Sequence, residues 1–142
     1  MRFGERLKEY MVDLGLTQES LEKATGITRS LISNFLLNKH TPSFDKLVAL
    51  LYYFNCSADY LLGLTDIPTS ETLCYVLPFN QRLRAILNDK NISQERLKRE
   101  LNISGSVVYK WLSGKNSPST DSLIKLAKFF DCSVDYLIGR LR

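Results

Sequence analysis

The fold of this chain is decided by the stretch Ser93–Ser119, SQERLKRELNISGSVVYKWLSGKNSPS. Its pattern of apolar residues predicts two short helices joined by a tight turn. Ser93 and Ser104 are good N-caps, because a serine hydroxyl can accept from an otherwise unpaired N–H of the first turn. Asn102, which lies between the helices, tolerates the left-handed backbone that such a turn often needs.

The second predicted helix has one apolar face and one polar face. Its apolar stripe is formed by residues at i, i+1, i+4 and i+5, namely Val107, Val108, Trp111 and Leu112. Its other face carries small, polar or basic side chains, namely Gly105, Ser106, Tyr109, Lys110 and Ser113. A buried first helix that holds such a second helix at a fixed angle suits a probe for the DNA major groove.

The same stretch occurs twice in the chain. Shifted by 76 residues, Phe3–Gly63 lies over Phe79–Gly139 without a gap, and about 23 of the 61 positions are identical. Each copy is long enough to bury a small core, and neither shows strand-like alternation. We therefore expect an all-α fold of two tandem five-helix domains, residues 1–66 and 78–142, with a linker at 67–77.

Cap residues place the helix boundaries of the first copy. Thr17, Thr28, Ser43 and Ser57 each precede a predicted helix and are expected to cap it. Asn38 is expected to stop the third helix in a left-handed conformation.

Both copies resemble the Xre/Cro/C1-type helix-turn-helix domain of phage and bacterial repressors. TQESLEKATGI and SQERLKRELNI are similar to that family's T-Q-x-x-L-A-x-x-x-G-I/V motif. SLISNFLLNKHTPS and SVVYKWLSGKNSPS are similar to its S-x-I-S-x-W/I-x-x-G-x-x-x-P-S motif, and NCSADYLLG and DCSVDYLIG to its G-V-S-x-D-Y-L-L-G tail. The resemblance covers nearly all of the chain except the linker. It implies lambda-repressor-like domains and a transcriptional regulator whose partner is double-stranded DNA.

The chain departs from the family pattern at several positions. Glu22 and Lys98 stand where the family usually has an alanine that packs the second helix of each copy closely on its third helix. The turn glycine is kept as Gly26 but is Asn102 in the second copy. Leu37 falls on the expected DNA face, where a polar residue is more usual.

The resemblance implies a set of DNA-binding residues in each copy. The second helix of each copy would begin beside the DNA backbone, and the third helix would enter the major groove. The loop after the third helix and the N-terminus of the fourth helix would bind phosphate. For the first copy the set is Gln18, Thr28, Arg29, Ser30, Ser33, Asn34, Lys39 and Ser43. For the second copy it is Gln94, Ser104, Gly105, Ser106, Tyr109, Lys110, Lys115 and Ser119. We expect Phe35 and Trp111 to be core residues rather than base-stacking residues.

Composition argues against several other classes of function. The net charge is +4, and residues 79–142 carry twelve Lys/Arg against six Asp/Glu, which favours a polyanionic partner. The three cysteines lack metal-ligand spacing, and there is one histidine. No apolar run approaches the roughly 18 residues of a membrane span. We expect a cytoplasmic protein that is not an enzyme, with no cofactor, no metal, no membrane partner and no evident small-molecule ligand.

A second interpretation stays open at this point. One copy binds DNA in it, and the other serves protein contacts, such as homodimer formation or an antitoxin-like partner. Leu37, Tyr52, Tyr53 and the apolar segment LCYVL at 73–77 would then form the interface. In either case the linker segment is expected to pack on a domain or at a domain or dimer contact.

Overall fold

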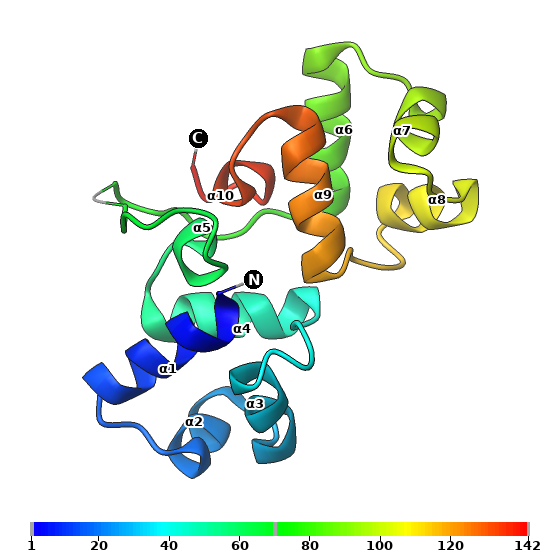
Figure 1. Cartoon of the computed structure of the whole chain (residues 1–142). Helices are drawn as coiled ribbons and strands as arrows, with labels where there is room; N and C mark the ends of the chain where they lie inside the picture. The colour runs from blue at the N-terminus through cyan, green and yellow to red at the C-terminus, as the bar shows by residue number, and fades with distance from the viewer. Residues whose placement is uncertain (1, 70, 142) are drawn as a thin grey trace. The chain divides into compact units, whose positions relative to one another are not determined.

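A computed structural model describes residues 2–69 and 71–141 of the chain. Within these ranges every regular element is an α-helix, so the expected all-α fold is confirmed (Figure 1). The chain divides into two compact units, Met1–Glu71 and Thr72–Arg142. The expected linker, 67–77, is therefore shared between the two units.

The two units repeat the same order of five helices. The first unit contains α1 (Phe3–Asp13), α2 (Gln18–Thr25), α3 (Arg29–Leu36), α4 (Phe44–Phe54) and α5 (Ala58–Leu61). The second contains α6 (Phe79–Lys90), α7 (Gln94–Leu101), α8 (Gly105–Ser113), α9 (Thr120–Phe130) and α10 (Val134–Leu137). The α1–α3 and α6–α8 pairs pack most extensively, so the first helix of each unit is the support for the third.

Each unit has its own apolar core. Fully buried side chains of the first unit come from all five helices and include Phe3, Leu7, Leu21, Ile32, Phe35, Leu47, Leu50 and Leu61. Those of the second unit include Leu83, Leu97, Val108, Leu123, Leu126, Phe130, Val134 and Leu137. Phe35 is 0% exposed and Trp111 is 5% exposed, so the expectation that both are core residues is confirmed. The expected stripe of α8 is wrong at one position, because Val107 is 37% exposed.

The predicted caps explain where most helices begin. The hydroxyls of Thr17, Thr28 and Ser57 each accept from a first-turn N–H of the helix that follows, as predicted. Ser43 is the N-cap of α4 by backbone conformation, but among the described residues its side chain makes no cap hydrogen bond. Asn38 has φ +57°, the left-handed conformation expected there.

A long-range contact replaces the missing local cap of α1. Arg2, the N-cap of α1, makes no side-chain cap bond. Instead the backbone N–H of Gly4 donates to Oδ1 of Asn38, at 2.9 Å. Asn38 follows α3, so one side chain ties the start of α1 to the end of α3. Because free N–H groups in a first turn need a partner, this bond also fixes the position of α3.

The segment before α6 is held by the C-terminal end of the second unit. The N–H of Cys74 donates to the carbonyl of Arg140 at 2.8 Å, and that of Leu77 donates to Ile138 at 3.0 Å. Nε of Arg140 donates to the carbonyl of Cys74, at 3.3 Å, and its Nη1 lies 3.7 Å from Oδ1 of Asp135. The side chains of Arg140 and Asp135 are both nearly fully buried. Cys74 and Leu77 are therefore bonded within their own unit, whereas Tyr75 between them is 77% exposed.

Candidate nucleic-acid interface

In the first unit, two capped helices and one glycine fix the position of α3. Thr17 and Ser20 form a reciprocal capping box at the start of α2. Gly26 then ends α2 with φ +76°, a conformation that costs glycine little. Thr28 accepts from the N–H of Leu31, so α3 begins at Arg29. Ile27 is buried and closes the corner between the two helices. The direction of α3 is thus set within a few residues.

The structure brings the expected first-copy residues of α3 onto one helix. Thr28, Arg29 and Ser30 are exposed, whereas Ser33 and Asn34 are half-buried. Lys39, in the loop after α3, and Gln18, the first residue of α2, are exposed too. Leu37, which follows α3, is 61% exposed. The accessible side of α3 therefore carries an arginine, hydroxyls and an amide.

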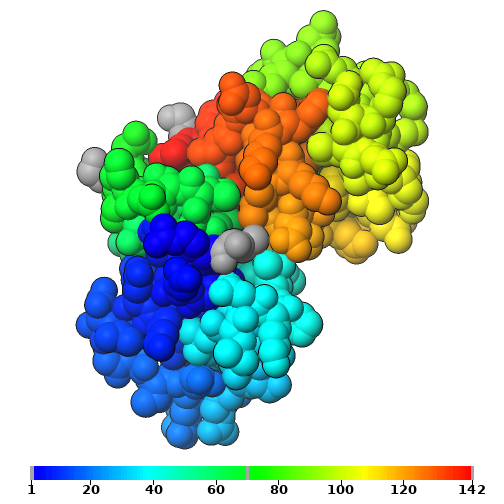
Figure 2. Space-filling model, in the orientation of Figure 1, coloured from blue at the N-terminus to red at the C-terminus, as the bar shows by residue number. Residues whose placement is uncertain are grey.

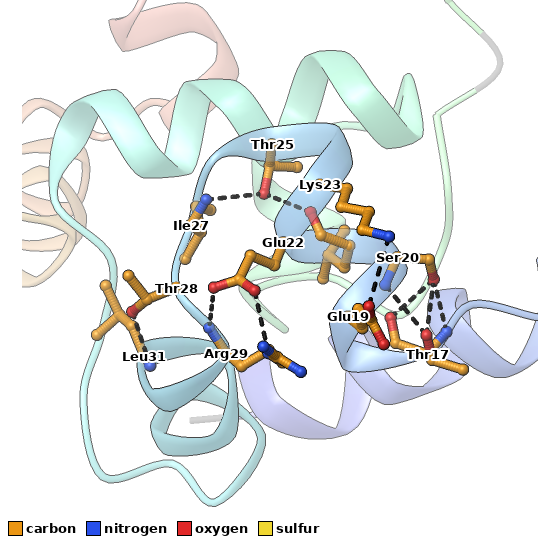
Figure 3. A network of polar contacts seen from close by, with 11 residues as sticks. Thr17, Glu19, Ser20, Glu22, Lys23, Thr25, Ile27, Thr28, Arg29 and Leu31 are labelled. Carbon is orange, nitrogen blue, oxygen red and sulfur yellow. Dashed lines mark hydrogen bonds and ion pairs between the residues drawn. The ribbon is translucent and has the colours of Figure 1, made fainter.

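The first side chain of α3 is held by an acidic residue of α2. One carboxylate oxygen of Glu22, Oε1, lies 3.0 Å from Nε of Arg29. The other, Oε2, accepts the backbone N–H of Arg29, also at 3.0 Å (Figure 3). A charge-assisted pair with two anchoring contacts is stronger than a single neutral hydrogen bond. Glu22 thereby fixes both the beginning of α3 and the side chain that begins it.

The second unit builds the same arrangement with different residues. Ser93 caps α7, Asn102 ends it with φ +52°, and Ser104 caps α8, as predicted. The outward residues of α8 are all exposed: Gly105, Ser106, Tyr109 and Lys110, together with the cap Ser104. Figure 2 shows the α7–α8 segment, in yellow-green and yellow, at the surface.

The loop after α8 and the first residues of α7 and α9 add positive charge and polar groups. Nζ of Lys115 lies 5.5 Å from the centre of the Tyr109 ring, which is within cation–π range. Gln94 is exposed at the first position of α7. Ser119 caps α9 by accepting from the N–H of Ser122, at 3.2 Å.

The charge at one matched position is reversed between the units. Lys98 stands at the position of Glu22, and Gly105 at that of Arg29. A Cβ added to Gly105 would lie 3.4 Å from Nζ of Lys98, so this ammonium sits beside the first turn of α8. It also pairs with Glu95, at 2.9 Å. From the sequence, Glu22 and Lys98 predict only a change in how the second and third helices of each copy pack. The signal that could have revealed the Glu22–Arg29 contact lies in the alignment of the two copies. The pair Glu22 and Arg29 in the first copy is replaced by Lys98 and Gly105 in the second.

Two family models match the chain, one in each half. Residues 4–67 match a model described as a helix-turn-helix domain, and residues 83–137 match one described as helix-turn-helix. The two matched ranges contain α2–α3 and α7–α8 respectively.

Curated relatives match about half of this chain. The HTH-type transcriptional activator BcrR of Enterococcus faecalis is 37% identical over 63 residues, which are 44% of this chain and 31% of that protein. The uncharacterized HTH-type transcriptional regulator YobD of Bacillus subtilis (strain 168) is 38% identical over 64 residues, 45% of this chain and 57% of that protein. The HTH-type transcriptional regulator ImmR of the same strain is 34% identical over 67 residues, 47% of this chain and 53% of that protein. The chain thus spans between 31% and 57% of the length of these relatives. No solved structure matches it significantly.

Two other features are absent from the residues that the structure describes. These residues contain no group of three or more His, Cys, Asp or Glu side chains placed to hold a metal ion. Among them, no helix combines the length and apolar character needed to cross a membrane.

Proposed function

This chain carries two helix-turn-helix domains in tandem, and on that premise we propose that it is a sequence-specific regulator of transcription that binds double-stranded DNA. One observation supports this most directly. In each unit a helix is fixed by a capped turn and by one buried aromatic residue, Phe35 or Trp111, while its polar side stays exposed in α8 and exposed or half-buried in α3. The names of the relatives point to the same role.

In the proposed complex, α3 and α8 each enter the major groove. Arg29 can bond O6 and N7 of guanine, and Asn34 can bond N6 and N7 of adenine. The α8 helix has no arginine or asparagine on its outward side, which is occupied by Ser106, Tyr109 and Lys110. The first unit is therefore the better equipped of the two to distinguish bases.

Contacts to phosphate would position both helices. Gln18 and Gln94 begin α2 and α7, where exposed N–H groups and the helix dipole favour an anion. Ser43 and Ser119 occupy the same kind of position at α4 and α9, and Lys39 and Lys115 lie in the preceding loops. Two linked domains suit two half-sites about one helical turn, about 34–36 Å, apart.

Arg29→Ala and Asn34→Ala are expected to relax base preference. Each should cost roughly 1–3 kcal/mol at its contacted base pair, because a bidentate contact is lost, and leave affinity for other sequences nearly unchanged. Selection of bound sites from random DNA with the full chain and each variant measures this. Lys8→Ala, on α1, is the control. An unchanged selected motif for Arg29→Ala would contradict base reading by this residue.

Lys110→Ala and Lys115→Ala are expected to weaken binding to all duplexes alike. Each removes about one phosphate contact, so the slope of log affinity against log salt should fall by about 1. Titration of a selected and an unrelated duplex at several salt concentrations measures the slope. Lys128→Ala, at the far end of α9 from Ser119, is expected to leave it unchanged. A loss confined to the selected duplex would contradict a phosphate role.

Exposed apolar residues favour a second candidate function, protein contact by the first unit. Leu37, Tyr52 and Tyr53 are 61%, 41% and 40% exposed, and Ile67 is 76% exposed. A first unit used for dimer formation would leave α8 as the DNA-binding helix. The molecular mass in solution and the effect of Arg29→Ala on the selected motif discriminate. A dimer whose motif does not depend on Arg29 would favour this candidate.

A further inference from the structure

Glu22 has no role in the function proposed above, yet it makes two contacts at the start of the proposed reading helix. Both of its carboxylate oxygens bond residue 29, one to the side chain and one to the backbone. The side chain of Glu22 is 31% exposed and that of Arg29 is 59% exposed. Both side chains are thus partly accessible at the start of α3, where Figure 3 shows them facing each other.

We propose that Glu22 is a specificity-determining residue that positions Arg29 for a base. The proposal rests on the function proposed above, since it assumes that α3 meets DNA. The two contacts at 3.0 Å are made by Nε and the backbone N–H, so they restrict the arginine stem, and neither of them uses the two terminal Nη groups. Those two groups form a planar fork that matches O6 and N7 of guanine.

The physical gain is preorganisation. A free arginine side chain carries about 2 kcal/mol of rotamer entropy, part of which is lost when it binds a base. A side chain already held by Glu22 loses less on binding, so more of the contact energy appears as base discrimination. The carboxylate also repels backbone phosphate, which lowers the affinity for every duplex alike. The preorganisation, not this repulsion, widens the ratio of specific to non-specific affinity.

The second unit offers an internal comparison. At the matched positions it has Lys98 and Gly105, so it has neither the carboxylate nor the arginine. Lys98 places a positive charge beside the first turn of α8, where phosphate rather than a base edge is the suitable ligand. The acid and the arginine are present together in one copy and absent together from the other, as expected if Glu22 serves Arg29.

The test is a thermodynamic cycle on the full chain. Glu22→Ala, Arg29→Ala and the double variant are titrated with the duplex selected by the unaltered protein and with duplexes changed at single base pairs. Glu22→Ala should reduce discrimination at the Arg29-dependent base pair by about tenfold, within the range of one bidentate contact. The double variant should discriminate no worse than Arg29→Ala alone, because the two residues act as one unit.

Two further variants separate positioning from a merely structural role. Glu22→Gln keeps an acceptor for the helix N–H but loses the charge, so it should reduce discrimination less than Glu22→Ala. Glu19→Ala removes another carboxylate of α2, whose partner is Lys23 at 3.4 Å, and should leave discrimination unchanged. Thermal unfolding of each variant confirms that the helices remain folded under the titration conditions.

The outcomes are distinct from failure of the proposed function. If the unaltered chain binds no duplex in dilute salt, the proposed function itself fails. If it binds with base preference, but Glu22→Ala keeps full discrimination or its loss adds to that of Arg29→Ala, only the positioning role is overturned. A rise in affinity for every duplex with discrimination intact would also overturn it, because Glu22 would then only mask the arginine.

Discussion

Gly4→Asn is expected to lower the free energy of unfolding of the first unit by about 3 kcal/mol, the upper end of the usual cost of overpacking. A Cβ at Gly4 would lie 2.7 Å from the carbonyl oxygens of both Phe35 and Leu36, and 2.9 Å from Oδ1 of Asn38. The first two are backbone atoms, so α1 would have to move away from α3. Hydrogen exchange of α1 and α3 amides during urea unfolding measures the loss.

The second unit provides the control for this position. Asn80 stands there at the position of Gly4, and Gly114 at that of Asn38. In the first unit the first helix carries the glycine and the asparagine follows the third helix, and in the second unit this is reversed. A Cβ on Gly114 would lie 3.5 Å from the side-chain amide nitrogen of Asn80.

Adding Asn38→Gly to Gly4→Asn should therefore recover part of the loss. Asn80→Gly should cost only about 1 kcal/mol, the usual penalty of glycine within a helix. Equal losses at residues 4 and 80 would contradict the steric explanation.

Asp135→Asn is expected to destabilise the second unit by about 3 kcal/mol. Asp135 and Arg140 are 2% exposed, and the change leaves the buried guanidinium without its opposite charge. Removing one partner of a buried ion pair typically costs about 3–5 kcal/mol, and the separation of 3.7 Å puts this pair at the lower end. Trp111 is the chain's single tryptophan and lies in this unit, so its fluorescence during urea unfolding reports the change.

Asp59→Asn is the matched control for Asp135→Asn. Asp59 stands at the position of Asp135 in the first unit, but Leu64 stands at that of Arg140. The control variant lacks an arginine at the position of Arg140, so we expect a smaller change, below about 1 kcal/mol. If the two variants lose equal stability, the loss arises from removing a carboxylate in the first turn of α5 or α10, and the ion pair with Arg140 does not explain it.

Much of the fold could be predicted from the sequence because it depends on near neighbours. Thr17, Ser93 and Ser104 cap helices within three residues of themselves, and Asn102 turns the chain in a left-handed conformation. The core positions of Phe35 and Trp111 follow from helical periodicity. The prediction that Val107 is part of the buried stripe is wrong because Val107 lies at the edge of that stripe, where periodicity alone does not decide whether a side chain is exposed.

Only part of the candidate interface can be predicted from periodicity and local hydrogen bonds. The exposed side of α3 follows from the same period that buries Phe35, so its polar residues could be named in advance. The partner of Arg29 could not, because Glu22 lies seven positions earlier on another helix. Only the angle between α2 and α3 brings the two side chains to 3.0 Å.

By itself, the sequence determined two copies of one five-helix unit, the ends of most helices and the side of each helix that is buried. These features depend on periodicity and on hydrogen bonds within a few residues. Only the tertiary structure decided which groups of different elements meet: Asn38 with Gly4, Arg140 with Cys74, and Glu22 with Arg29. Such pairs depend on how the helices and the segments between them pack. The periodicity of apolar residues along the chain does not contain that information.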